Sequence, residues 1–194
     1  MESDPIIHRK RVLRAELRER RQNLTTTERT QATAGLTRNL IDLVTDLSAR
    51  SLSAYLSTNI EPDTRPFLNW AIGHDLRVLL PISREDGLLD WTTGDGTSET
   101  EGLHGLPEAV GELLGPIAIN DVDLIIVPAA AVDATGVRLG WGRGYFDKTL
   151  GSMEKCPPVY AAIFDSELLD QIPRELHDQP VDGVVTPTRI VQFT

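Results

Sequence analysis

Residues 136–147 combine residue types that bind anions. The segment reads GVRLGWGRGYFD, so four glycines are interleaved with Arg138 and Arg143 and followed by Asp147. Glycine lets several backbone N–H groups turn toward one point, and the forked donors of arginine match phosphate oxygens. A surface turn is the alternative interpretation, but the interleaved arginines favour a phosphate site. Asp147 could hold a metal ion beside the phosphates.

The familiar phosphate-binding motifs do not match this segment. No Lys-Ser or Lys-Thr pair follows the last glycine, and the spacing is G-x-G-x-G where a dinucleotide fold has G-x-G-x-x-G. The residues alone therefore predict a polyanion site of unspecified type.

A basic helix near the start of the chain is a second candidate. Asp4 and Pro5 predict a helix start, and apolar residues at helical spacing continue to about Leu24. Lys10 and Arg14 border this apolar stripe, so each needs a counter-charge. A bound phosphate or a carboxylate of the protein could supply it.

Two loop carboxylates, Glu61 and Asp178, are further candidates. Such residues are most often caps or solvated charges, although Glu61 follows a predicted strand at the end where ligands bind. If Asp178 approached Asp147, the pair would suit Mg²⁺. Trp141 and Tyr145 could stack on a planar ligand. The four histidines lack zinc-ligand spacing and no G-x-S-x-G segment occurs, which argues against zinc chemistry and serine hydrolysis.

Predicted helices and strands alternate along the chain. We expect helices at 5–24, 25–47, 63–74, 145–150 and 166–171, strands at 51–56, 76–80, 87–92, 123–127, 159–164 and 183–185, and a long functional loop at 94–115. This order predicts an α/β sandwich with a mainly parallel sheet, in which ligands bind at the carboxyl ends of the strands. The glycine-rich segment is expected at such an end.

Length and composition predict one domain spanning 1–194. The net charge of -10 argues against nucleic-acid binding, and no apolar run is long enough to cross a membrane. The polar, acidic beginning of the chain does not look like a signal peptide, and the single cysteine cannot form an intrachain disulfide. We therefore expect a cytoplasmic monomer without nucleic-acid or membrane partners.

Together these residues resemble the 5-formyltetrahydrofolate cyclo-ligase (5,10-methenyltetrahydrofolate synthetase) family. The resemblance includes KRVLR at 10–14, YLS at 55–57 with Glu61, GLPE at 105–108, and residues 123–128 leading into the glycine-rich segment. It resumes at Ile172-Pro173, His177-Asp178 and Val185-Thr186. The most specific part is R-L-G-x-G-x-G-Y followed by an aromatic residue and Asp.

The resemblance implies a three-layer α/β/α sandwich of the Rossmann-like, ribose-phosphate isomerase/CoA-transferase type. It also implies ATP- and Mg²⁺-dependent cyclisation of 5-formyltetrahydrofolate to 5,10-methenyltetrahydrofolate through a phosphorylated formyl group. By matching positions, metal ligands would be Asp147 and Asp178, and catalysis would use Lys10, Arg138, Arg143 and Glu61. The ATP site would comprise Lys10, Arg14, Arg138, Leu139, Gly140, Trp141, Gly142, Arg143, Gly144, Tyr145 and Phe146. The folate site would comprise Leu56, Glu61, Trp141, Gly142, Arg143, Gly144 and Tyr145.

The chain departs from the family pattern at several positions. Trp141 stands where a basic residue is common, and Phe146 replaces a frequent tyrosine. A lost arginine would weaken binding of phosphate or of the folate tail, for which Arg143 could compensate. Two alternatives stay open: a divergent paralogue that acts on another metabolite, and a folate-binding protein without catalysis.

Overall fold

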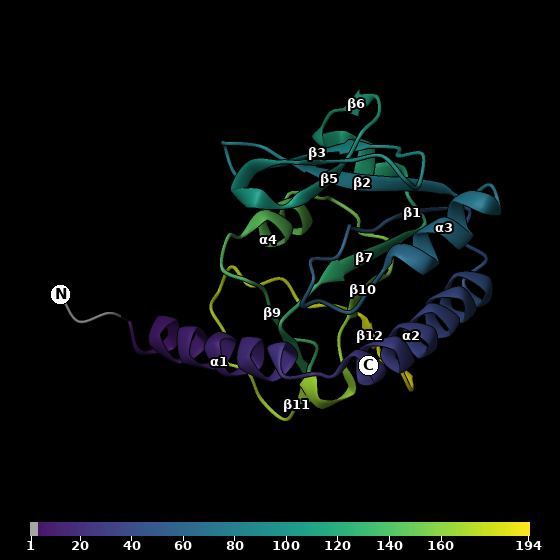
Figure 1. Cartoon of the computed structure of the whole chain (residues 1–194). Helices are drawn as coiled ribbons and strands as arrows, with labels where there is room; N and C mark the ends of the chain where they lie inside the picture. Colours follow the sequence, from purple (N-terminus) through teal and green to yellow (C-terminus); the bar gives the residue numbers. More distant parts are fainter. Residues whose placement is uncertain (1–3) are drawn as a thin grey trace.

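Eight strands form the central sheet of the computed structural model, which describes residues 4–194 (Figure 1). Their order is β13 (Ile190–Gln192), β12 (Gly183–Val185), β10 (Val159–Ala162), β7 (Leu124–Pro128), β1 (Ser51–Ser53), β2 (Arg77–Ser83), β3 (Leu89–Thr92), β6 (Leu113–Leu114). The strands from β12 to β2 in this order are parallel, and β13, β3 and β6 join antiparallel at the two edges. This confirms the predicted mainly parallel sheet.

Helical segments cover both faces of this sheet. On one face, α2 (Thr26–Asp46) and α3 (Arg65–Gly73) pack Leu40 and Phe67 against side chains that include Ile126 of β7. On the other face, η2 (Pro116–Asp121) and α4 (Tyr145–Gly151) pack against Ile125 and its neighbours. Alternate residues of β7 are therefore buried on opposite sides, as its continuous apolar run predicts. The layered α/β/α arrangement is confirmed.

The helix starts follow from capping residues. α1 (Pro5–Gln22) begins after Asp4, whose Oδ1 accepts a hydrogen bond of 2.9 Å from the backbone N of Ile6. α2 begins after Thr25, which forms a reciprocal capping box with Glu28. Each cap satisfies backbone N–H groups that have no partner inside the helix, which is why both predicted starts are confirmed.

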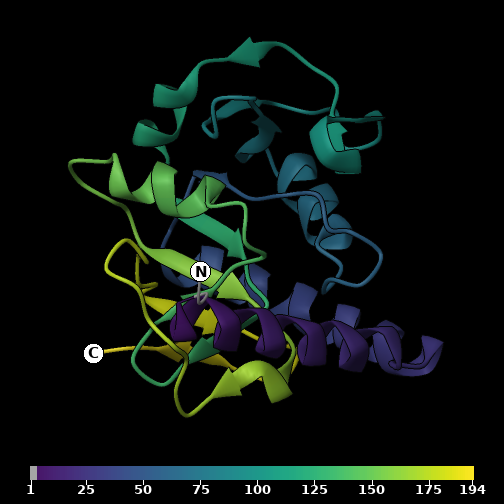
Figure 2. The same ribbon diagram turned by 90° about the vertical axis from the view of Figure 1, so that its left-hand side faces the viewer.

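A small second sheet, absent from the sequence prediction, supports α1. It comprises β11 (Leu168–Leu169), β8 (Ala131–Asp133) and β9 (Arg138–Leu139). Leu17 of α1 is fully buried against this sheet in a cluster with Val137 and Leu139. In the turned view, α1 crosses the lower part of the molecule with the yellow-green segment of β11 beneath it (Figure 2).

Several predicted boundaries were wrong. The first strand stops at Ser53, three residues early, and the second continues through Pro81 to Ser83. Because β1 pairs only with residues 77–79, the later part of β2 pairs with β3 alone, and proline is tolerated in a strand with one free edge. The predicted helix at 166–171 is a 3-10 turn (η3, Asp165–Glu167) followed by β11, because Leu168 and Leu169 pair with β8.

The predicted loop at 94–115 contains ordered secondary structure. β4 (Glu99–Glu101) and β5 (Pro107–Ala109) form a hairpin around the 3-10 turn η1 (Leu103–Gly105), and β6 follows. These strands have two or three residues each and show no alternation of buried and exposed positions, so the sequence carries no strand signal for them. Within residues 4–194, no helix is both long and apolar enough to cross a bilayer.

Candidate active site

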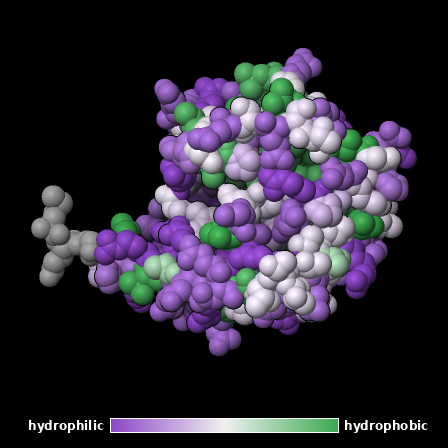
Figure 3. All heavy atoms as spheres, in the orientation of Figure 1, coloured by the Kyte–Doolittle hydropathy of each residue, from purple (hydrophilic) through white to green (hydrophobic). Residues whose placement is uncertain are grey.

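A cavity of about 560 Å³ lies between α1, the glycine-rich segment and the strands that lead into the β4–β5 hairpin. The space-filling view shows a hollow between α1 and this β-rich part of the molecule (Figure 3). Every site residue predicted above lines this cavity except Leu139, whose side chain packs against Leu17 instead. Residues from seven separate parts of the chain thus surround one space: 7–18, 55–61, 81–89, 106–108, 128, 138–147 and 175–178.

Lys10 has two carboxylate partners at one end of the cavity. Its buried Nζ donates hydrogen bonds of 2.6 Å to Oε2 of Glu175 and 2.6 Å to Oδ2 of Asp178. The counter-charge expected for Lys10 is therefore supplied by the protein. The chain places the second carboxylate by a local turn, since the backbone N of Glu175 donates to Asp178 Oδ2 at 2.8 Å.

Arg14 of α1 contacts the glycine-rich segment. Its Nε donates to the carbonyl oxygen of Gly140 at 2.7 Å, and a Cβ at Gly142 would lie 3.6 Å from its Cζ. Gly142 has φ of 98°, a conformation that only glycine adopts without strain. Burial lowers the pKa of Arg14. Within residues 4–194 its guanidinium forms no ion pair, so its charge is available to an anion.

Arg138 links the end of β7 to α4. Its Nη1 donates to the carbonyl oxygen of Pro128 at 2.7 Å, and its Nη2 lies 3.5 Å from Oδ1 of Asp147. Desolvation of this buried side chain lowers the pKa of Arg138. Oδ1 of Asp147 also accepts from the backbone N of Gln179 at 3.1 Å. Arg138 is thus compensated by Asp147, whereas the exposed Arg143 has no side-chain hydrogen bond or ion pair within the described chain.

A potential metal-binding group lies beside Lys10. Ligand atoms of Glu175, His177 and Asp178 all lie within 4.8 Å of one another. Asp147 is not a member of this group, although Gln179 connects it to the same turn. Glu175 and His177 were not among the predicted ligands; their spacing of three and one residues from Asp178 was the available signal.

Glu61 and Tyr55 form the opposite end of the cavity. Oε2 of Glu61 accepts a hydrogen bond of 2.7 Å from the backbone N of Thr58, and burial raises the pKa of Glu61. The side chain of Tyr55 is buried, and burial raises its pKa well above the usual value. Its hydroxyl has no hydrogen-bond partner among the described residues. Tyr55 was not among the predicted site residues, although it belongs to the YLS segment, and its aromatic ring also packs in the core.

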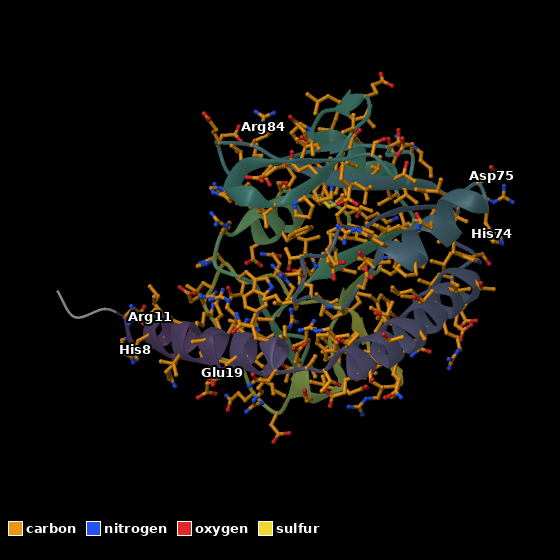
Figure 4. The ribbon with its side chains drawn as sticks, viewed as in Figure 1. His8, Arg11, Glu19, His74, Asp75 and Arg84 are labelled. Atoms are coloured by element: carbon orange, nitrogen blue, oxygen red, sulfur yellow. The ribbon has the colours of Figure 1, made fainter. Side chains whose placement is uncertain are left out.

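Tyr145 connects the glycine-rich segment to the β4–β5 hairpin. Its hydroxyl donates to the carbonyl oxygen of Arg84 at 3.0 Å and lies 3.2 Å from Nε2 of His104. Arg84 is labelled on the β-rich part of the molecule, across the cavity from α1 (Figure 4). Glu108, the last residue of the GLPE segment, also lines the cavity and accepts from the backbone N of Ser83 at 2.8 Å.

A mainly parallel α/β sheet with a glycine-rich loop beside arginines and carboxylates, near the carboxyl ends of its strands, is an arrangement typical of proteins that bind polyanionic ligands. Residues 6–187 match the model of the 5-formyltetrahydrofolate cyclo-ligase family, and the chain belongs to this family. The resemblance read from the sequence is thereby confirmed, and so is the assignment to the ligases.

Two bacterial relatives and one solved structure illustrate the similarity. The 5-formyltetrahydrofolate cyclo-ligase of Mycolicibacterium smegmatis is 36% identical over 148 residues, which cover 74% of this chain and 76% of that protein. Its counterpart in Escherichia coli K12 is 28% identical over 184 residues, covering 91% and 100%. The NMR structure of Aquifex aeolicus 5,10-methenyltetrahydrofolate synthetase superimposes with a TM-score of 0.78 at 27% identity, covering 94% and 92%.

Proposed function

We propose that the protein cyclises 5-formyltetrahydrofolate to 5,10-methenyltetrahydrofolate and hydrolyses ATP to ADP and phosphate in the process. The observation that carries this proposal is that one cavity joins a basic, glycine-lined end to an end with the half-buried carboxyl group of Glu61. A reaction between a nucleotide and a folate needs both ligands in contact within one enclosure. Family membership supports the same activity.

The basic end suits the phosphates of ATP. Lys10, Arg14 and residues 138–146 offer cationic groups and backbone N–H groups around one space, with positive φ angles at Gly142 and Gly144. Phosphoryl transfer is catalysed mainly by positioning and charge neutralisation, so this end requires no protein nucleophile. Lys10 and Arg143 would neutralise charge that develops on the transferred phosphoryl group.

The opposite end suits the folate. Leu56 and the ring of Tyr145 provide apolar surface, and Glu61 provides a carboxyl group with a raised pKa. A carboxyl group that gains a proton can donate one hydrogen bond and accept another, which matches the mixed donors and acceptors of a pterin ring. Glu61 would thus orient the pterin so that the formyl oxygen and N10 face the phosphates.

The reaction then needs two displacements. The formyl oxygen attacks the γ-phosphorus of ATP, and the bond from that phosphorus to the bridging oxygen breaks, with its electron pair leaving on ADP. N10 attacks the activated formyl carbon and loses its proton. The carbon–oxygen bond breaks, phosphate departs, and a methenyl cation remains between N5 and N10.

Mg²⁺ fits the residues at the Lys10 end. Asp178 and the adjacent Glu175 supply oxygen ligands, and Asp147 lies next to the same turn, which matches the preference of Mg²⁺ for one or two carboxylates plus phosphate oxygens. Such an ion would neutralise phosphate charge. One central sheet takes strands from residues between Ser51 and Gln192, which supports a single domain. We further propose that residues 1–194 act as a monomer in the cytoplasm.

The test combines product formation with nucleotide consumption. Purified protein, 5-formyltetrahydrofolate and Mg-ATP should yield methenyl absorbance in the near ultraviolet and ADP in equal amounts. ADP without methenyl product would indicate another acceptor, as in a divergent paralogue. Folate binding without either product would indicate a binding protein.

A pair of arginine variants locates the nucleotide. Arg14→Ala removes a guanidinium that lines the cavity, whereas the control Arg20→Ala removes an exposed charge from the same helix. We expect KM for ATP to rise on the order of tenfold or more in Arg14→Ala, as for the loss of one charge-assisted hydrogen bond, and to stay unchanged in the control. Equal KM values in the two variants would contradict the assigned nucleotide site.

A further inference from the structure

Arg18, which none of the predicted roles includes, lines the cavity while stacked on an aromatic ring. Its Cζ lies 5.2 Å from the centroid of the Trp141 ring, within the range of a cation–π interaction. Arg18 follows Arg14 by four residues on α1, so the two side chains lie on neighbouring positions of one helix face. The opposite face of α1, which carries His8 and Glu19, is exposed to solvent (Figure 4).

Arg21 and an apolar cluster hold the Trp141 ring in place. The guanidinium of Arg21 lies 5.0 Å from the same ring and is fixed by Glu167, with hydrogen bonds of 2.7 and 2.8 Å. Trp141 also packs against the apolar cluster that contains Leu17. A ring fixed by a buried ion pair and an apolar cluster provides a rigid platform for Arg18, which lowers the entropy lost when its side chain binds a ligand.

The charges around the cavity separate into compensated and uncompensated cations. Lys10 and Arg138 face carboxylates, as described above. Arg14, Arg18 and Arg143 also line the cavity, and no ion pair to any of them is formed within residues 4–194. Like charges at positions i and i+4 repel one another on a helix, so Arg14 and Arg18 together favour an anion between them.

We propose that Arg18, positioned by Trp141, binds an oxyanion of the ligand and so determines affinity for one of the two substrates. This inference rests on the proposed function. The shared chemistry is a phosphate or carboxylate oxygen accepting hydrogen bonds from a guanidinium. Its two sources are the phosphate chain of ATP and the glutamate carboxylates at the end of the folate.

The experiment compares Arg18→Ala with Arg20→Ala, which removes an exposed charge two residues further along α1 that does not line the cavity. KM is measured for ATP, for 5-formyltetrahydrofolate and for its triglutamate form. We expect KM for one substrate to rise on the order of tenfold in Arg18→Ala, as for one charge-assisted hydrogen bond, while kcat stays close to wild type. A rise for ATP identifies the phosphates, and a rise for the folates identifies the carboxylates.

Two further variants and a binding measurement complete the test. Trp141→Leu retains the charge of Arg18 but removes its platform, and Arg18→Lys retains charge but not the planar stack, so both should show intermediate KM values. Equilibrium binding of inorganic tripolyphosphate and of the triglutamate folate, each alone, tests Arg18 without turnover. If Arg18→Ala has wild-type activity, unchanged KM values and unchanged binding, the inference about Arg18 is wrong while the proposed function stands. If the wild type binds these ligands but forms no methenyl product, and Arg18→Ala binds them more weakly, the role of Arg18 is supported and the proposed function is wrong.

Discussion

Replacing Glu167 with leucine would leave a buried positive charge without its counter-ion. The side chains of Arg21 and Glu167 are almost wholly buried, with 1% and 3% exposed residue surface. Nε and Nη2 of Arg21 donate to the two carboxylate oxygens, and Nη2 also donates to the carbonyl oxygen of Ala129 at 2.7 Å. The Nη1 atom of Arg21 is buried with no hydrogen-bond partner among the described residues, so without Glu167 the guanidinium would have no carboxylate partner and would keep the single hydrogen bond to Ala129.

The expected loss is large for a domain of this size. Removing one partner of a buried ion pair costs about 3–5 kcal/mol, because the remaining charge stays desolvated. Glu167→Leu also removes the acceptor of the Phe164 backbone N–H, at 2.9 Å in the wild type. For a domain of 150–250 residues, each kcal/mol lowers Tm by about 2–4 °C, so Tm should fall by about 6–20 °C.

Urea unfolding and calorimetry measure this loss. Glu16→Leu, which removes an exposed carboxylate from α1, should stay within about 0.5 kcal/mol of wild type. The double variant Arg21→Met, Glu167→Leu removes both charges and should recover most of the lost stability, as apolar replacements of buried ion pairs do. A Glu167→Leu protein within about 1 kcal/mol of wild type, or a double variant no more stable than Glu167→Leu, would refute the reasoning.

Three further predictions concern other parts of the molecule. Glu61→Gln should make the free energy of unfolding higher than in wild type at about pH 8 but not at about pH 4. Burial raises the pKa of Glu61 in the folded state, so the stability that protonated Glu61 contributes is complete below the pKa of the unfolded state. This contribution is lost as pH rises through the pKa of the folded state. The same dependence of unfolding free energy on pH in the two proteins would contradict this. Gly35→Ala should cost about 1–3 kcal/mol in urea unfolding, because a Cβ there would overlap the carbonyl oxygen of Pro187, whereas Gly73→Ala meets no atom within 4 Å and should be neutral or better. Tyr145→Phe should speed amide exchange at residues 102–106 but not in α2, because it removes the hydroxyl that contacts Arg84 and His104; unchanged exchange would show that this contact does not hold the hairpin.

Local patterns were sufficient for the starts of α1 and α2 and for the innermost strand. Asp4 and Thr25 cap two helix starts, and each cap bonds to a residue only two or three positions further along the sequence. The apolar run of β7 needs both faces covered, which predicts a parallel sheet between helix layers. The glycine-rich segment likewise carries its own signal, because positive φ at Gly142 and Gly144 requires glycine whatever surrounds it.

Other features depend on contacts between distant residues. The pairing of Lys10 with Asp178 joins positions 168 residues apart, and no periodicity in α1 shows which of the two possible counter-charges is present. β8, β9 and β11 contain two or three residues each, too short for an alternating pattern to be recognised. Trp141 looked like a ligand-stacking residue, and the sequence could not show that two arginines of α1 lie against its ring.

The position of α1 also has a consequence for how the chain folds during synthesis. α1 leaves the ribosome before the other described elements, yet its buried Lys10 and Arg21 pair with carboxylates that are 146 to 168 residues further along the chain. Lys10 and Arg21 must therefore remain without their carboxylate partners while most of the sheet is assembled, and the closing of so long a loop makes this docking a slow step. A nascent chain that ends before residue 167 could build much of the central sheet but would have no enclosed cavity.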